Sequence, residues 1–247
     1  ELDFWLPFGL SNCTSVYSGN VILVAGETNA GKTGLLLNIV AKNWRHKFRY
    51  LSSEMTPREL RNRLLNFGIP LEEWKAHCEF IQRSQNFHDA IDPDGINVID
   101  YLEISDEFYK TGRYITQVFE QLRKGIAIIS LQKKKGEMFG RGGEFALEKP
   151  RLGISLFTHG HTPDGVFGSA VVTKAKNIKG SNPQGKEIFY RLNRGFDYDV
   201  RPLMSCPTIH EGLHYYSEKE RKAALSEIEN YCLSVQKPET TPLEDEF

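Results

Sequence analysis

The stretch VILVAGETNAGKTGLLLNIVAKN, residues 21–43, decides the fold. Its apolar start, residues 21–25, predicts a buried strand, and the pattern over 32–43 predicts a helix. Between them, residues 26–33 fit the pattern G-x-x-x-x-G-K-[ST], which in a strand–turn–helix context is typical of a phosphate-binding loop. The alternative, a glycine-rich turn with an incidental lysine, leaves the match of both flanks unexplained.

The chemistry of phosphate binding accounts for the residue types in this loop. Glycines at 26 and 31 allow a tight turn, and successive N–H groups at a helix N-terminus attract phosphate oxygens. Lys32 is expected to reach the β- and γ-phosphates, and the Thr33 hydroxyl to bind Mg²⁺. The predicted nucleotide-binding residues are Gly26, Glu27, Thr28, Asn29, Ala30, Gly31, Lys32, Thr33 and Gly34.

Strand-like and helix-like stretches alternate along the rest of the chain. The further strand-like runs are 48–51, 79–82, 96–99, 126–131, 152–157, 170–173 and 187–192. The further helix-like stretches are 57–67, 106–124 and 218–233. Apolar strands separated by helices predict an α/β fold with a mostly parallel central sheet covered by helices on both faces. The last two strands flank the Gly/Asn/Pro-rich stretch 177–185 and predict a C-terminal β-hairpin extension.

The composition is that of a globular protein with little net charge. The chain has 247 residues, of which 40% are hydrophobic, and a net charge of −1, so nucleic acid could be bound only through local basic patches. No apolar run approaches the roughly 20 residues of a membrane span. The four cysteines form no C-x-x-C pair, which disfavours a zinc site and predicts reduced thiols in the cytoplasm. We expect an N-terminal arm (1–15), one ATPase-like domain (16–210), and a C-terminal helix with an acidic tail (211–247).

Two carboxylates follow predicted strands. Asp100 ends the buried run INVID and could hold Mg²⁺ through water, whereas the alternative is an aspartate that caps a helix. Glu54 follows the predicted strand 48–51 and could orient and deprotonate an attacking water. An exposed glutamate before a helix explains Glu54 equally well on spacing alone.

Several motifs, in order, resemble those of the DnaB-like replicative helicases. FRYLSSEMTPRELRNRLL (48–65) resembles the segment in which a strand ends in Ser-x-Glu-Met before a helix with Glu/Gln-Leu and then arginine. INVIDYLEI (96–104), AIISLQKKKG (127–136) and VVTKAKN (171–177) resemble the family's metal-binding strand, sensor strand and finger hairpin. The matching positions of the first segment are Ser52, Glu54, Met55, Glu59, Leu60 and Arg63.

This resemblance implies a RecA-like P-loop fold and assembly into a ring, a hexamer. It also implies that the protein hydrolyses ATP with Mg²⁺ at the subunit interfaces of the ring and translocates on single-stranded DNA. It implies that Glu54 is the catalytic base, Asp100 the metal-side acid and Gln132 the γ-phosphate sensor. It also implies a replicative partner, a primase or primase-polymerase in cis or in trans. Lys174 and Lys176 stand where the helicases carry a lysine and an arginine, and two lysines are more similar to RecA recombinases.

Lys174 and Lys176 alternate on a predicted strand, so both can face a neighbouring subunit's nucleotide and act as a finger in trans. A solvated basic strand edge is the alternative. Lys133, Lys134, Lys135 and Arg141 lie in a glycine-containing loop that is expected to follow a DNA backbone. The alternative there is a solvated mobile loop.

Three further interpretations concern aromatic and histidine residues. Phe139 or Phe145, in the stretch 133–151 that contains these basic residues, could stack on bases. His159-Gly160-His161 is expected to be a loop rather than a metal pair, and the aromatic residues at 4, 5 and 8 either pack on the domain or dock a neighbour.

Three functions follow from these residues. The leading hypothesis is the motor of a DNA helicase that acts in replication. The second is a RecA/RadA-like recombinase filament with the same ATP site. The third is a slow ATP-binding switch or scaffold without unwinding activity.

Overall fold

The computed structural model describes residues 1–100, 110–200 and 215–236. Its centre is a nine-stranded sheet with the order β3-β2-β4-β5-β1-β6-β7-β8-β9. The parallel strands are β3 (Cys78–Gln82), β2 (Phe48–Ser52), β4 (Ile96–Asp100), β5 (Ile126–Gln132), β1 (Val21–Gly26) and β6 (Leu152–Thr162). The antiparallel strands that follow are β7 (Gly165–Ala175), β8 (Glu187–Asn193) and β9 (Asp197–Asp199).

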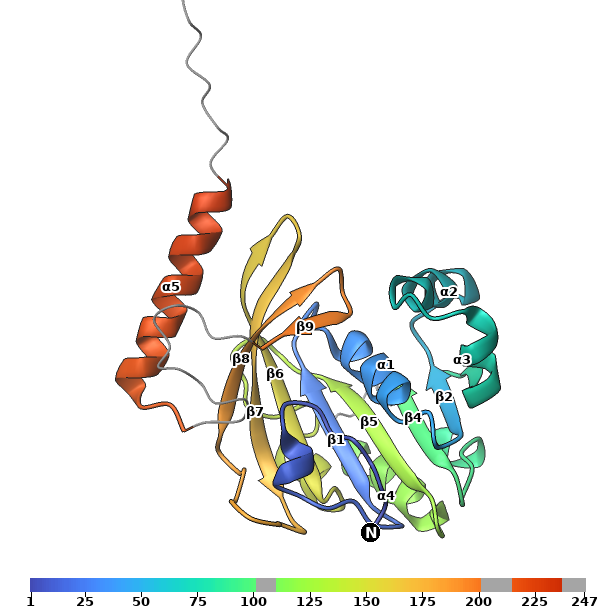
Figure 1. Cartoon of the computed structure of the whole chain (residues 1–247). Helices are drawn as coiled ribbons and strands as arrows, with labels where there is room; N and C mark the ends of the chain where they lie inside the picture. The colour runs from blue at the N-terminus through green and yellow to red at the C-terminus, as the bar shows by residue number, and fades with distance from the viewer. Residues whose placement is uncertain (101–109, 201–214, 237–247) are drawn as a thin grey trace, which may run out of the picture.

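Helices cover both faces of the parallel part, as Figure 1 shows, with α1 in front of the sheet and α4 behind it. The helices are α1 (Lys32–Lys42), α2 (Pro57–Asn66), α3 (Leu71–His77), α4 (Thr111–Gln121) and α5 (Glu218–Gln236). Side chains of β1 alternate between two apolar clusters: Ile22 and Val24 join the cluster of α1, and Val21 and Leu23 join the cluster that contains Ile115 of α4. The predicted mostly parallel sheet flanked by helices is therefore confirmed.

The helix that follows Glu54 begins with a complete capping box. The Thr56 hydroxyl accepts a hydrogen bond from the Glu59 N–H (3.3 Å), and the Glu59 carboxylate accepts one from the Thr56 N–H (2.9 Å). Pro57 occupies the first turn, where its missing N–H removes no helical hydrogen bond. These contacts fix the point at which the chain leaves β2, and with it the position of Glu54.

The hairpin region differs from the expectation. β6 and β7 are longer than the predicted runs and form a tight antiparallel hairpin in which Thr162 pairs with Gly165. His159 and His161, expected in a loop, lie in β6. The predicted strand ends at Phe157, where the apolar run ends. The apolar run ends there because β1 pairs with β6 only as far as Leu156, and beyond that point β6 has β7 as its neighbour. The predicted hairpin of β7 with β8 is confirmed.

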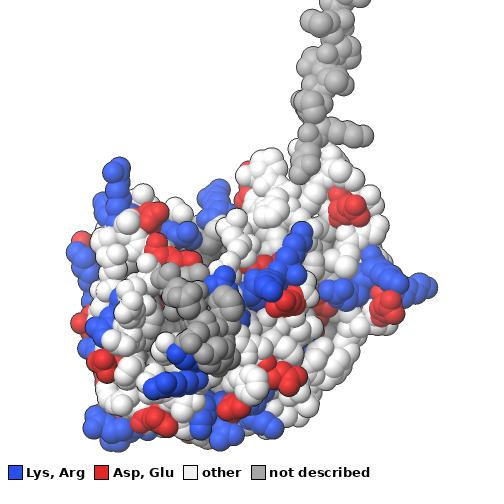
Figure 2. All heavy atoms as spheres, turned by 180° about the vertical axis from the view of Figure 1, so that it is seen from behind, with Lys and Arg blue, Asp and Glu red and all other residues white. Residues whose placement is uncertain are grey.

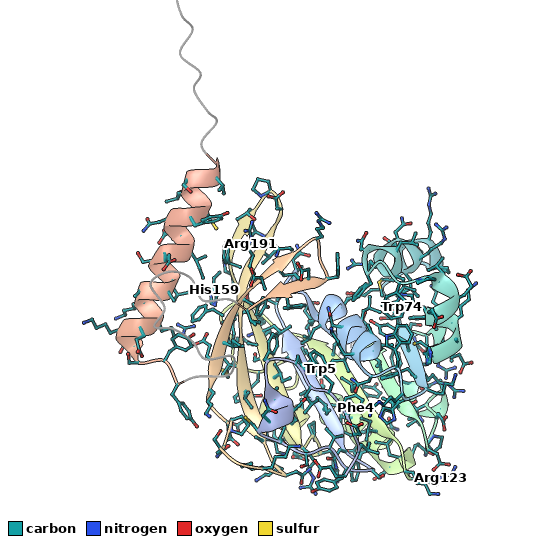
Figure 3. All side chains as sticks on the ribbon, viewed as in Figure 1. Phe4, Trp5, Trp74, Arg123, His159 and Arg191 are labelled. Atoms are coloured by element: carbon teal, nitrogen blue, oxygen red, sulfur yellow. The ribbon has the colours of Figure 1, made fainter. Side chains whose placement is uncertain are left out.

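The N-terminal arm packs on its own domain. Phe4 and Phe8 are buried, and Phe8 stacks on Tyr190 with ring centroids 5.8 Å apart. The Asn43 side chain accepts a hydrogen bond from the Trp5 N–H (2.7 Å) and donates one to the Trp5 carbonyl (3.1 Å). Figure 3 shows Phe4 and Trp5 beside the sheet. Of the two interpretations, packing matches Phe4 and Phe8, whereas the Trp5 side chain is 36% exposed and its contacts with Asn43 are made by the Trp5 backbone.

The C-terminal helix α5 packs against the antiparallel part of the sheet, where Ile228 and Cys232 join Phe167 and Phe189 in an apolar cluster. Arg191, labelled in Figure 3, lies with its guanidinium carbon 5.5 Å from the ring centroids of Phe167 and Tyr231. Among the described residues, no helix is long and apolar enough to cross a membrane. The end of the INVIDYLEI motif (101–104), the first residues of the predicted 106–124 helix and the acidic tail lie outside the described residues.

Candidate nucleotide-binding and catalytic site

The phosphate loop joins β1 to α1, as the sequence predicts. Gly31 has φ +89°, and a Cβ there would lie 2.3 Å from the Tyr198 hydroxyl oxygen, so only glycine fits. Gly31 is also the N-cap of α1 and has no side chain that could accept the first N–H groups of the helix. The start of α1 is therefore suited to phosphate oxygens, which such N–H groups and the helix dipole attract.

Lys32 is held over this loop by the loop's own backbone. Its Nζ donates hydrogen bonds to the carbonyls of Gly26 (3.1 Å) and Glu27 (2.9 Å). Burial lowers the pKa of Lys32, and the negative charges of Glu54, Asp100 and Glu27 oppose that shift. The ammonium is thus placed beside three carboxylates and at the start of a helix, where it can bind a polyphosphate together with its metal ion.

Asp100 lies at the carboxyl end of β4 and is only 2% exposed. Tyr50 Oη donates a hydrogen bond to Oδ2 (2.7 Å), and Ser130 Oγ donates one to Oδ1 (3.3 Å). Burial raises the pKa of Asp100, whereas hydrogen bonds with Tyr50, Thr33 and Ser130 and the charge of Lys32 lower it. The hydrogen bond with Thr33 brings together the two side chains predicted to hold Mg²⁺.

Glu54 and Gln132 line the same cavity as the phosphate loop. The cavity has a volume of about 600 Å³, and Lys32 and Thr33 also line it. The sheet register explains this, because Gly26 at the start of the loop pairs with Gln132 at the end of β5. Gln132 Nε2 donates a hydrogen bond to Thr28 Oγ1 (2.8 Å). The predicted base, sensor and phosphate loop therefore converge on one site.

Comparisons with known proteins agree with this architecture. A KaiC-like protein from the hyperthermophilic archaeon Pyrococcus horikoshii is similar in structure, with a TM-score of 0.61, 17% identity, and coverage of 81% of this chain and 98% of that one. A RadB recombinase is similar with a TM-score of 0.53, 17% identity, and coverage of 72% and 89%. The fold is RecA-like. No protein-family model and no curated protein matches the sequence.

Two tyrosines of the RecA-like domain that the sequence did not suggest support the phosphate loop. Tyr190 of β8 donates its hydroxyl to the Ala30 carbonyl (2.8 Å), and Tyr198 of β9 donates to the Gly31 carbonyl (2.6 Å). Burial raises the pKa of both hydroxyls, so both remain donors. They lie some 160 residues along the chain from the carbonyls they contact, and no local motif signals such a contact.

The far wall of the cavity comes from two turns. A Cβ on Gly34 would lie 2.3 Å from the Gly195 carbonyl oxygen, so the β8–β9 turn packs directly on the first turn of α1. The β6–β7 turn contributes Pro163 and Asp164 to the same wall. No sequence motif marks either turn as part of the site. Other lining residues outside the predicted set are Arg63, His161, Thr162, Gly165, Val166, Leu192 and Arg194.

Lys174 and Lys176 lie at the opposite end of the strands from this cavity. Lys174 pairs with Gly153 at the beginning of β6, whereas the phosphate loop follows the end of β1. Lys174 Nζ donates hydrogen bonds to the carbonyls of Leu147 and Glu148. Burial lowers the pKa of Lys174, and the nearby charges of Lys176 and Arg151 lower it further. Lys176 is exposed, so one of the two candidate finger residues is accessible to another molecule.

Lys133 is not placed as expected. It is 3% exposed, and its Nζ donates hydrogen bonds to the Glu137 carbonyl (2.8 Å) and Ser155 Oγ (2.9 Å). The ammonium lies 2.9 Å from the ring centroid of Phe157. Strand geometry places Lys133 on the same face of the sheet as Leu131, with Gln132 on the other face; Leu131 and Lys133 are buried and Gln132 is partly exposed. A direct DNA contact from Lys133 is therefore incompatible with its buried position.

We call residues 134–141 the basic loop. Lys134 and Lys135 are exposed and Arg141 is partly buried. Phe145, just beyond the loop, is 64% exposed, whereas Phe139 is partly buried. Figure 2 shows that basic and acidic side chains are interspersed on the face opposite that of Figure 1, in keeping with the net charge of −1. Any attraction of DNA to the basic loop is therefore local.

Proposed function

We propose that this protein is a Mg²⁺-dependent ATP hydrolase of the RecA type that acts on single-stranded DNA as a homo-oligomer. The observation that carries the proposal is the convergence of Lys32, Glu54 and Gln132 on one cavity, with Asp100 hydrogen-bonded to Thr33 beside it. A structural phosphate site would need the loop and the lysine. It would not need a carboxylate, a sensor amide and a metal-side acid at the ends of three neighbouring strands.

Each residue has a distinct task in this proposal. Lys32 binds the β- and γ-phosphates, and Thr33 and Asp100 hold Mg²⁺, which neutralises phosphate charge when bound. Glu54 orients a water and accepts its proton as the water attacks the γ-phosphate. Gln132, hydrogen-bonded to Thr28 of the loop, detects whether the γ-phosphate is present. Nothing in this set specifies the base of the nucleotide, and ATP is proposed from the DnaB-like resemblance.

Two biological roles share this chemistry. The order of the motifs favours a helicase motor, with a hexameric ring and a primase-type partner. The similarity to the RadB recombinase and the presence of two lysines at 174 and 176 favour a recombinase-type filament. Of these two roles, the similarity to the RadB recombinase supports the recombinase alternative better than the helicase. A strand-displacement assay and a strand-exchange assay, run with the same preparation, distinguish the two roles. Electron microscopy with ssDNA and an ATP analogue distinguishes rings from filaments.

The hydrolysis itself is tested at Glu54. Glu54→Gln should still bind Mg²⁺–ATP but lose about 10²–10⁴-fold in turnover, because the phosphate and metal contacts remain while the base is gone. Lys32→Ala should lose binding as well as turnover. The matched control is Glu72→Gln on α3, which removes the same charge at an exposed position. Turnover of Glu54→Gln at the wild-type rate in the presence of ssDNA would show that the base has been assigned incorrectly.

A further inference from the structure

Glu27, the second residue of the phosphate loop, has a side chain that phosphate binding does not require. It is 5% exposed, although the loop motif uses only the backbone at this position. Its Oε1 accepts a hydrogen bond from the Gly136 N–H (2.8 Å), and its Oε2 accepts one from the Thr158 N–H (3.0 Å). A single buried carboxylate therefore connects the phosphate loop to the middle of the basic loop and to β6.

The rest of the basic loop is anchored to the same region. The Lys133 N–H donates to the Gly26 carbonyl (3.1 Å), and the Arg141 N–H donates to the Gln132 carbonyl (2.9 Å). Both ends of the loop thus start from residues beside the phosphate loop, and Glu27 holds its centre. A displacement of Glu27 moves the acceptor of the Gly136 amide directly.

Below about pH 7, Lys133 places a positive charge near this carboxylate. Burial lowers the pKa of Lys133 to about 7, and attraction from Glu27 and Glu137 opposes the shift. The Lys133 ammonium donates hydrogen bonds to Ser155 of β6 and to the Glu137 carbonyl of the basic loop, and these two contacts fix its position. A buried carboxylate that makes two hydrogen bonds and lies near a buried cation has few alternative positions. Glu27 is thus a fixed, direct contact between the phosphate loop and the basic loop.

We propose that Glu27 is a positioning residue that makes the conformation of the basic loop depend on what the phosphate loop binds. The proposal rests on the proposed function, in which the phosphate loop binds nucleotide and the basic loop binds single-stranded DNA. Nucleotide and DNA then change each other's affinity by the same factor, since coupling between two binding sites is reciprocal. The DNA segment is recognised through its phosphates by Lys134 and Lys135.

Glu27→Gln tests this role because a carboxamide has one acceptor oxygen where the carboxylate has two. The variant can keep the hydrogen bond to one amide, but its NH₂ group must then face the other N–H. It also removes the charge near Lys133. Glu27→Asp keeps the charge and shortens the side chain by one methylene, so it cannot reach both amides at once. Glu144→Gln, exposed on the segment after the basic loop, is the matched control for loss of a charge.

The measurement is the coupling factor, the ratio of the Kd of a Mg²⁺-bound non-hydrolysable ATP analogue without oligo-dT to its Kd with saturating oligo-dT. The wild type and Glu144→Gln should have a factor of about 5 or more, in the range of ordinary allosteric coupling. Glu27→Gln should reduce the factor to within about twofold of 1, whatever its own nucleotide Kd, and Glu27→Asp should lower it as well. A wild-type coupling factor in either Glu27 variant would overturn the proposal.

Hydrogen exchange separates this proposal from the proposed function. Adding the nucleotide analogue alone should change amide exchange in peptides that span 134–141 in the wild type, and this change should be lost in Glu27→Gln. If the wild type bound no oligo-dT but showed that Glu27-dependent change, the DNA function would fail and the positioning role would stand. An equal nucleotide-induced change in the wild type and Glu27→Gln would refute the positioning role, whether or not DNA binds.

Discussion

Replacing Lys133 with methionine should change how the stability of the protein depends on pH. Methionine has nearly the same length and no charge, so Lys133→Met removes the buried ammonium while filling its space. In the native protein, burial lowers the pKa of Lys133 from 10.5 to about 7, against the opposing attraction of Glu27 and Glu137 and with repulsion from Lys32. Between these two values the unfolded chain binds a proton that the folded chain does not.

The sign and size of the effect follow from that difference. Stability rises with pH wherever the unfolded state binds more protons, so the free energy of unfolding should increase from about pH 7 towards pH 10.5. Below about pH 7, both states hold the proton and Lys133 contributes no pH dependence. Because one pKa unit corresponds to about 1.4 kcal/mol, going from about pH 7 to about pH 8.5 should stabilise the wild type by about 1.5 kcal/mol more than Lys133→Met.

Urea denaturation at these two pH values, followed by tryptophan fluorescence, measures the effect as a difference between proteins. The contribution from the buried thiol of Cys78 is common to both proteins and cancels. Lys134→Met, at an exposed position next to Lys133, is the control and should follow the wild type. If the wild type and Lys133→Met gained the same stability between the two pH values, the buried position of Lys133 would not be maintained in solution.

Two further predictions concern DNA and assembly. Replacing Lys134 and Lys135 with alanine should weaken binding to single-stranded DNA of any sequence and flatten the slope of log K against log salt by up to about 0.7 per lost phosphate contact. The control Lys75→Ala on α3 should change neither the affinity nor the slope. An unchanged slope in the double variant would show that DNA binds elsewhere. Mixing Lys176→Ala subunits with Lys32→Ala subunits should restore some ATPase activity that neither has alone; full activity of Lys176→Ala by itself would exclude a finger in trans.

Much of the site was predictable because its parts are local in the chain or follow from strand order. The phosphate loop is one continuous motif. Glu54, Asp100 and Gln132 follow or end neighbouring parallel strands, whose carboxyl ends meet at one edge of the sheet. Strand order places all three at the same end of the sheet; Glu54 and Gln132 line the cavity, and Asp100 reaches it through its hydrogen bond with Thr33. The role of each as base, metal-side acid or sensor stays a prediction.

Other parts could not be predicted, for two physical reasons. Tyr190 and Tyr198 contact the phosphate loop although they lie far from it in the chain, and no local sequence pattern encodes such a contact. Lys133 begins a run of three lysines, and such a run is typical of a solvated loop. Strand geometry nevertheless continues one residue past β5 and turns Lys133 to the buried face of Leu131, near Glu27. Because β5 is buried on both faces, its sequence has no period of two that would have signalled this.

The position of the hairpin lysines bears on how subunits must associate. Lys174 and Lys176 lie where β6 begins, and the phosphate loop lies where β1 ends, so one subunit cannot bring both to the same nucleotide. If Lys176 acts in trans, the end of the sheet that carries Lys174 and Lys176 in one subunit must contact the end that carries the phosphate loop in the next subunit. Such a head-to-tail contact uses different surfaces on the two partners, and it closes into a ring or continues as a filament according to the rotation between subunits. Under the proposed function, the same interface is compatible with a ring or with a filament, and the rotation between subunits, rather than the catalytic residues, decides which of these two assemblies forms.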